Sequence, residues 1–367
     1  MANDPEAASL LMVPHHAAPR SARTAAAARW ALRLALSLWL VIIYYRPPRL
    51  DDYDRVIFHE LIYGQAWRPF VTRALVPLIV RTSVLGPRHA FDARFIRQYE
   101  ECQLHSENPF LREYLVVLLL SFACTGLFSF TLEKLWAALL HPSRPHAYLF
   151  SILGLLGLPA MFKYHAYIYD FPTLLLSTAG LLMIARQAWG RYLLIFCLAS
   201  LNKETAILLV VIWALYFRLA AQTEPRSYWS FLLLQCVIYA VTRGALAYAF
   251  RENPGGVLEF HFTDHNLKLL TSPWTLPGMV TTGLLATMVF HRLGSKPWLL
   301  RCAARMLLIL VAFTLFFGYL DELRDYFEVY AAVAALIGIS VSEFMGSPVR
   351  SILPVDAAQV GSFHARD

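Results

Sequence analysis

Charged residues are scarce in this chain of 367 residues: Asp, Glu, Lys and Arg make up 16% of it, whereas 58% of it is hydrophobic. A soluble domain needs more polar surface than this to cover its core. The scarcity of charge therefore excludes an ordinary soluble protein. It indicates a chain that exposes apolar side chains to lipid.

Several signatures of known chemistry are also missing. The five cysteines are scattered and form no CxxC pair, so neither a disulfide framework nor a thiolate metal site is expected. There is no Walker A loop and no Gly-x-Ser-x-Gly elbow, which leaves ATP-driven and serine-hydrolase chemistry without support. The net charge of +7 comes from single Lys and Arg residues between apolar stretches. Without a basic stripe with interleaved aromatic residues, a nucleic-acid partner is not expected.

What the chain does have is a series of long apolar runs. A bilayer core of about 30 Å takes about 20 apolar residues per helix, so the chain has room for roughly ten spans. We therefore expect an all-α, polytopic transmembrane helix bundle whose partner is the lipid bilayer. The runs 191–201 and 204–217 are short and are either two crossings or two half-depth helices. The predicted spans are 30–45, 114–132, 148–163, 166–185, 191–201, 204–217, 228–250, 276–291, 303–320 and 326–342.

The runs divide the chain into three parts. Residues 1–29 are Ala-rich and polar, contain three prolines, and predict a disordered cytoplasmic N-terminus. Residues 30–342 form the transmembrane domain, and residues 343–367 a cytoplasmic tail. The first span ends in Tyr-Tyr-Arg-Pro-Pro and not in a cleavage site, so we expect it to be retained, with Arg33 reaching back to the cytoplasmic headgroups.

The distribution of basic residues predicts the orientation. If the N-terminus is cytoplasmic, most of the short loops on that side carry at least two Arg or Lys residues, as the positive-inside rule requires. The acidic residues, the histidines and most of the tyrosine motifs then collect on the outer face. Because Arg outnumbers Lys and Ala and Leu dominate, we expect a multi-pass protein of the bacterial inner (plasma) membrane.

One segment complicates this topology. Residues 46–112 form a long extracytoplasmic loop in which 68–81 alternates Arg with apolar residues, as an amphipathic interfacial helix would. We expect 71–85 to lie flat on the membrane surface. The alternative is that 71–85 crosses the membrane, in which case every later loop changes sides.

Two acidic sites are candidates for catalysis. Asp51, Asp52 and Asp54 follow the first span and can supply a general base with a neighbouring carboxylate. The alternative is a solvated acidic turn. Asp170 lies about one helical turn inside a predicted span, where an ionised group is costly unless it lines a cavity or has a partner.

Further charged and aromatic residues stand where predicted spans begin or end. Lys163, His165 and Tyr169 stand where one predicted span ends and the next begins, and the alternative is an aromatic belt with a lysine at the interface. Lys203 and Glu204 interrupt an apolar stretch, either as a substrate-binding pair or as a hydrated turn. Arg324 and Glu328 lie at the start of the last span, where Arg324 among four acids resembles an anion-binding group.

A metal site is the least supported of the candidates. His261 and His265 are four residues apart with Asp264 beside the second, a spacing that can hold a divalent metal on a helix. The Glu of a zinc-hydrolase signature is missing, and two nearby glycines weaken the case for a helix. The cofactor is therefore unknown, and a divalent metal remains one option.

This arrangement resembles the multi-spanning glycosyltransferases of the GT-C superfamily over roughly residues 30–342. The resemblance is carried by the acidic run at Asp51 to Asp54, the amphipathic segment 68–81, the junctions Tyr169-Asp170-Phe171-Pro172 and Asn202-Lys203-Glu204-Thr205, and the segment 322–328 before the last span.

The resemblance implies transfer of a sugar from a polyprenyl-phosphate donor to an envelope glycan, lipid or protein on the outer face. An acid of the first outer loop, Asp51, Asp52 or Asp54, would act as general base or hold a metal. Lys163, Lys203 and Arg324 would hold the lipid phosphate. The chain departs from larger members because only residues 343–367 follow the last span, which leaves the acceptor open.

Two other classes remain possible from the sequence. A secondary transporter or lipid flippase would concentrate polar residues near the middle of the membrane and show repeated halves, whereas here the charges lie at one rim. A noncatalytic envelope-assembly protein would have no need of the acidic loop.

Overall fold

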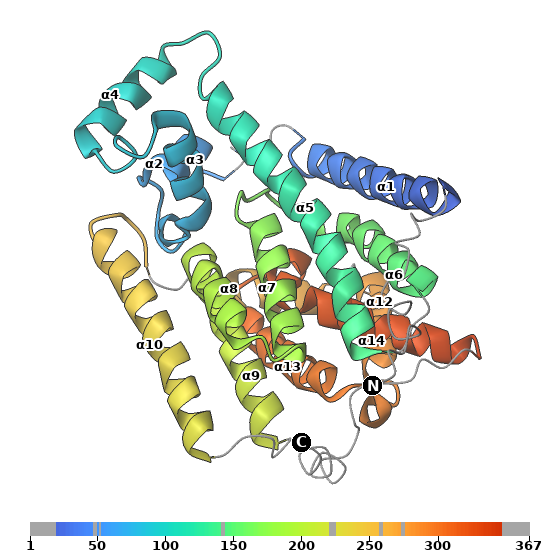
Figure 1. Ribbon diagram of the computed structural model, residues 1–367. Coiled ribbons are helices and arrows are strands. Elements are labelled where there is room, and N and C mark those ends of the chain that lie inside the picture. The colour runs from blue at the N-terminus through green and yellow to red at the C-terminus, as the bar shows by residue number, and fades with distance from the viewer. Residues whose placement is uncertain are drawn as a thin grey trace, which may run out of the picture.

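The computed structural model describes residues 20–46, 50, 53–140, 144–219, 225–256, 260–272 and 276–346. Every regular element in these ranges is helical (Figure 1), which confirms the predicted all-α class. The longer helices are α1 (Arg20–Tyr44), α3 (Leu75–Leu85), α4 (Ala93–Leu104), α5 (Leu111–Leu139), α6 (Arg144–Leu156), α7 (Asp170–Ala185), α8 (Trp189–Asn202), α9 (Ile207–Leu219), α10 (Pro225–Ala249), α12 (Leu276–Phe290), α13 (Trp298–Phe317) and α14 (Phe327–Phe344).

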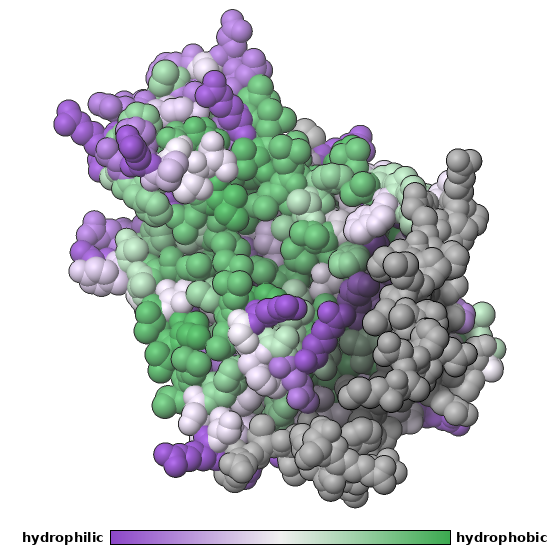
Figure 2. Space-filling model, viewed as in Figure 1, coloured by the Kyte–Doolittle hydropathy of each residue, from purple (hydrophilic) through white to green (hydrophobic). Residues whose placement is uncertain are grey.

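The apolar runs coincide with helices, but these differ in length. Within the described ranges, five stretches are long and apolar enough to cross a membrane: Thr24–Tyr44, Leu111–Leu139, Arg226–Ala249, Trp298–Phe317 and Leu323–Phe344. The remaining runs form shorter helices. The longest of them, α7, has 16 residues and is about 24 Å long, less than a bilayer core. Figure 2 shows that apolar side chains dominate the visible surface of the bundle.

Helix α1 begins earlier than the first predicted span. It starts at Arg20, inside the segment expected to be disordered, because the run Ala25–Ala28 has the highest helix propensity of any residue type. Residues 1–19 lie outside the described part of the chain, as does the tail beyond Gly346.

Arg33 does not reach towards headgroups as predicted. Its side chain is buried, its Nη2 lies 2.5 Å from Glu133 of α5, and its Nε donates to Ser129 Oγ at 3.0 Å. Ser151 of α6 accepts a further bond at 3.3 Å. Because a carboxylate neutralises the guanidinium inside the bundle, the charge has no need of the membrane surface. The pair instead joins α1, α5 and α6.

The segment predicted to lie flat is folded into a lobe at one end of the bundle. The lobe comprises α2 (Phe58–Tyr63), α3 and α4 (Figure 1), and polar side chains cover its tip (Figure 2). Helix α3 has 11 residues, about 16 Å, which is too short to cross a bilayer core. Its buried Val76 and Val80 pack against the rest of the lobe and α5.

The lobe is held to the bundle by the loop after α10. Asn253 Nδ2 donates to the carbonyl oxygens of Gly64 at 2.9 Å and Ala66 at 3.0 Å. The Arg68 amide donates to Pro254 O at 2.8 Å. Gly255 has a φ of +94°, and a Cβ there would lie 2.5 Å from Arg68 O.

A Gly255→Ala variant is therefore expected to lose about 1–3 kcal/mol of stability, because alanine is strained at this φ and contacts a backbone oxygen. Thermal unfolding in detergent measures the loss. Gly244→Ala is the matched control, since Gly244 lies inside α10 with open space around it. An equal effect of the two variants would show that the docking of this loop contributes nothing.

Candidate functional site

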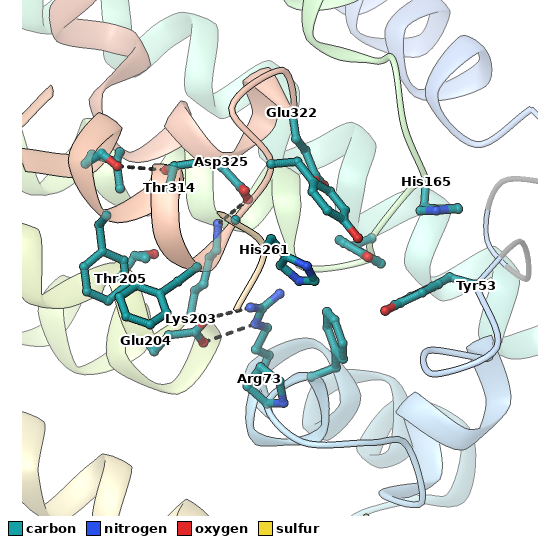
Figure 3. Close-up of a pocket in the computed structure, with 18 residues that line it drawn as sticks. Tyr53, Arg73, His165, Lys203, Glu204, Thr205, His261, Thr314, Glu322 and Asp325 are labelled. Atoms are coloured by element: carbon teal, nitrogen blue, oxygen red, sulfur yellow. Dashed lines mark hydrogen bonds and ion pairs between the residues drawn. The ribbon is translucent and has the colours of Figure 1, made fainter. Parts of the chain in front are cut away.

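The ends of several helices meet beneath the lobe. Helices α1, α8 and α13 end there, and α7 and α14 begin there, so the charged junctions of the sequence converge on one end of the bundle. A cavity of about 190 Å³ lies at this junction (Figure 3). It is lined by residues from six segments, at 53, 69–73, 165–167, 203–205, 261 and 310–325.

Lys203 supplies a cation to the cavity wall. It follows α8 directly, its side chain is 8% exposed, and its Nζ lies 3.0 Å from Glu328 Oε1 and 4.0 Å from Asp325 Oδ1. The Thr205 hydroxyl also donates to Glu328. The ammonium thus lies between two carboxylates, and Figure 3 shows its ion pair with Asp325.

Arg73 supplies the second cation. Its guanidinium meets Glu204 through two bonds, Nε to Oε2 at 3.1 Å and Nη2 to Oε1 at 2.5 Å. It also donates to the Tyr169 hydroxyl. Arg243 of α10 lies 3.8 Å from the same Glu204 and donates to Thr72 O at 3.1 Å. Two arginines share one carboxylate, which fixes the lobe segment against α8 and α10.

Three carboxylates line the cavity, and Asp325 is the least engaged of them among the described residues. Glu204 is held by Arg73, and Glu322 is held by Arg324, whose Nε donates to Oε1 at 2.5 Å. Asp325 has only the ion pair with Lys203 at 4.0 Å, and 31% of its side chain is exposed. A carboxylate in this state can accept a proton from a bound ligand.

Asp170 lies behind the wall and does not line the cavity. It is 2% exposed, accepts a hydrogen bond from the Tyr44 hydroxyl, and lies 3.8 Å from Arg324 Nη1. Arg324 is itself buried, with its guanidinium 4.0 Å from the centre of the Tyr167 ring. The structure therefore gives Asp170 the partners that a charge at this depth requires.

The remaining walls are aromatic and apolar. Tyr53 stacks on His165 with ring centres 5.2 Å apart, and these two close the side of the cavity away from Lys203 (Figure 3). Leu310, Phe313 and Phe317 of α13 form the apolar wall. Phe313 is 47% exposed, so this wall continues onto the outer, apolar face of the bundle.

Asp321 joins three loops beside the cavity. It lies 2.5 Å from Lys163 Nζ and 2.9 Å from His265 Nε2, and the Tyr164 hydroxyl donates to it. Burial by itself raises the pKa of Asp321, but the hydrogen bonds from Lys163, Tyr164 and His265 outweigh it and lower the pKa to about 2.

This lowered pKa predicts a dependence of stability on pH. A carboxylate whose pKa is lower in the folded chain stabilises it above the ordinary pKa of about 3.9, and the contribution is lost as pH falls towards 2. After discounting for solvent screening at the exposed Lys163, we expect Asp321→Asn to cost about 1–2 kcal/mol at pH 7. Unfolding in detergent at pH 7 and pH 2.5 measures this. A cost that persists unchanged at pH 2.5 would contradict the assignment.

The predicted site residues separate into three groups. His165, Lys203 and Glu204 line the cavity, whereas Tyr169, Asp170, Arg324 and Glu328 are buried behind its wall. Lys163 is exposed and pairs with Asp321. Asp54 is exposed and does not line the cavity, although its neighbour Tyr53 does. Asp51 and Asp52 lie outside the described residues.

The predicted histidine metal site is not assembled. His261 lies 3.1 Å from Asp264, but His265 turns to Asp321, and both rings pack on Tyr319 with centre distances of 4.5 and 4.2 Å. Residues 262–266 form one turn of π-helix, in which each hydrogen bond joins residues five apart along the chain. In the ranges that the structure describes, no three His, Cys, Asp or Glu side chains gather to hold a metal.

Sequence reasoning missed Arg73, Tyr167, Glu322 and Asp325 as cavity residues. Arg73 belongs to the segment 68–81, whose alternating arginines predict an interfacial helix. That interpretation places Arg73 at the membrane surface and not in a cavity. Asp325 and Glu322 flank Arg324 in the acid-rich start of the last span, so the signal was present there. The sequence pattern alone does not predict which of these acids faces the cavity.

Comparisons with known proteins identify no relative. No protein-family model, curated protein or solved structure matches the chain. The function is therefore argued from the cavity alone.

Proposed function

We propose that this chain is an integral membrane glycosyltransferase that moves a sugar from a polyprenyl-phosphate donor to an envelope glycan, lipid or protein acceptor. In this proposal α6, α7, α8, α9 and α12 cross with the longer helices, and the bilayer thins locally around them because they are shorter than its core. This gives about ten spans in a GT-C-like arrangement. The N-terminus lies in the cytoplasm and the cavity faces outwards, at the bacterial inner membrane. One observation carries the proposal: Asp325, a carboxylate whose side chain is 31% exposed, lies 4.0 Å from the Lys203 ammonium in the wall of a cavity whose α13 side is apolar.

The cavity suits a ligand that is polar at one end and apolar at the other. Lys203 and Arg73 offer positive charge to a phosphate, and the α13 wall with the exposed Phe313 offers an apolar path to lipid. Tyr53 and His165 add flat surface and polar edges for a sugar. A polyprenyl-phosphate sugar combines these three parts in one molecule.

The groups present account for the chemical step. Asp325 takes the proton of an acceptor hydroxyl as that oxygen forms a bond to the anomeric carbon of the sugar. The bond between the anomeric carbon and the phosphate oxygen breaks, and its electron pair leaves with the polyprenyl phosphate. Lys203 and Arg73 stabilise the developing negative charge on that phosphate.

A secondary transporter or flippase is the main rival. Such proteins bind their substrates near the middle of the membrane, on broken helices. In the described chain the ionisable residues of the cavity stand at helix ends, since α8 ends at Asn202 and α14 begins at Phe327. This placement at one rim favours an enzyme that works at the membrane surface over a carrier.

The test is an assay of the purified chain in nanodiscs. Polyprenyl-phosphate-linked sugars of several kinds are supplied with an extract of envelope acceptors, and released polyprenyl phosphate is measured by mass spectrometry. Release above a protein-free control is expected for at least one sugar. No release for any sugar, together with movement of a labelled lipid or solute across liposomes, would overturn the proposal in favour of a carrier.

A further inference from the structure

We infer that Asp170 is a positioning residue that acts on the cavity through Arg324 and Glu322. In this assignment Asp170 holds the Arg324 side chain in place. Arg324 in turn orients the Glu322 carboxylate, and Glu322 contacts the sugar. The inference rests on the proposed function, because it gives Glu322 a substrate to contact.

The first link joins Asp170 to Arg324. Both side chains are 3% exposed and Arg324 Nη1 lies 3.8 Å from Asp170 Oδ2. The Tyr44 hydroxyl, from the end of α1, donates to the same carboxylate oxygen. Asp170 is thereby held from two elements and cannot turn into the cavity, so it has no route to a substrate of its own.

The second link joins Arg324 to Glu322. Arg324 Nε donates to Glu322 Oε1 at 2.5 Å, and Nη2 pairs with the same oxygen. The guanidinium carbon lies 4.0 Å from the centre of the Tyr167 ring, which also stacks on Tyr169 with ring centres 5.1 Å apart. Arg324 is buried with two carboxylates and a ring around it and does not line the cavity. In this assignment it therefore orients Glu322 and does not bind the phosphate.

The third link reaches the cavity. Glu322 lines it, and both contacts from Arg324 meet Oε1, so Arg324 does not engage Oε2. A carboxylate that is kept ionised and oriented by an arginine is a strong acceptor for a sugar hydroxyl. Glu322 thus binds the sugar, while Asp325, three residues along, remains the base.

A double-mutant cycle with Asp170→Asn and Arg324→Gln tests the relay. If Asp170 acts only through Arg324, each single variant raises the KM for the donor by about 10- to 100-fold, because Glu322 is no longer oriented to accept a hydrogen bond from the sugar. The double variant then loses no more than the worse single variant. Loss of folded protein would lower kcat and leave KM unchanged, so KM separates positioning from structural damage. If the increases in KM of the two single variants instead multiply in the double variant, the inference is wrong.

A second experiment on the same relay does not require a measurable transfer activity. Cryo-EM structures of the wild type and of Asp170→Asn in nanodiscs are compared, with Asp264→Asn as a control at an exposed carboxylate away from the relay. We expect Arg324 to leave the Tyr167 ring and Glu322 to turn in Asp170→Asn alone. Unmoved Arg324 and Glu322 would refute the relay. An inactive wild type would refute the proposed function, and this structural arm would still decide the inference.

Discussion

Asp325→Asn is expected to slow sugar transfer by about 100- to 10,000-fold, which is what a general base contributes. Asparagine has nearly the same shape as aspartate but cannot take the proton of the acceptor hydroxyl. The KM for the donor should change little, because Lys203 and Arg73 remain to hold the phosphate. Initial rates of polyprenyl-phosphate release, measured over a range of donor concentrations, separate the two parameters.

Two carboxylate variants complete that experiment. Glu101→Gln removes an exposed acid of α4 that does not line the cavity, so it should retain the wild-type rate. Asp54→Asn examines the acidic run singled out in the sequence. If Asp54→Asn is inactive while Asp325→Asn is fully active, the base belongs to the first outer loop and the assignment of Asp325 is wrong.

Glu204→Gln is expected to cost about 3–5 kcal/mol of stability, the loss typical when one partner of a buried ion pair is removed. Glu204 is the carboxylate that Arg73 and Arg243 share. Its loss leaves two largely buried guanidinium groups close together without a counter-charge. The measurement is thermal unfolding of purified protein in detergent, with limited proteolysis to show whether the lobe detaches first.

The matched control for that variant is Glu252→Gln. Glu252 also pairs with an arginine, Arg251 at 3.5 Å, but its side chain is 87% exposed. An exposed pair of this kind contributes about 1 kcal/mol or less. Equal losses in the two variants would mean that the shared carboxylate does not hold the lobe to the bundle.

The helices were predictable because the signal for them is local. Each apolar run bounded by charges became a helix, since hydrophobicity and helix propensity act within a window of neighbouring residues. Their lengths were less predictable. The run 166–185, for example, includes part of the loop that precedes a helix. Helix α7 begins only at Asp170, because the residues before it form part of the cavity wall.

The site was predictable in part for the same reason. Lys203 and Glu204 stood out because a charge in an apolar stretch requires partners. The partners themselves lie far along the chain, since Arg73 and Glu204 are 131 residues apart. No local pattern states which of many arginines meets which acid. The same limit applies to Asp170: its place in an apolar stretch predicts a partner, but not that the partner is Arg324.

The separation of these partners has a consequence for how the chain is synthesised. In the topology that we propose, Lys203 enters the membrane while Glu328, which neutralises it, has yet to leave the ribosome. Thr205 and Glu328 are 123 residues apart, and Tyr44 and Asp170 are 126 apart. Burying an ammonium or carboxylate without its counter-charge is costly. Lys203 at the outer rim is therefore expected to stay hydrated until α14 brings Glu328 to it, so the closing of this charged cluster is a late step of assembly.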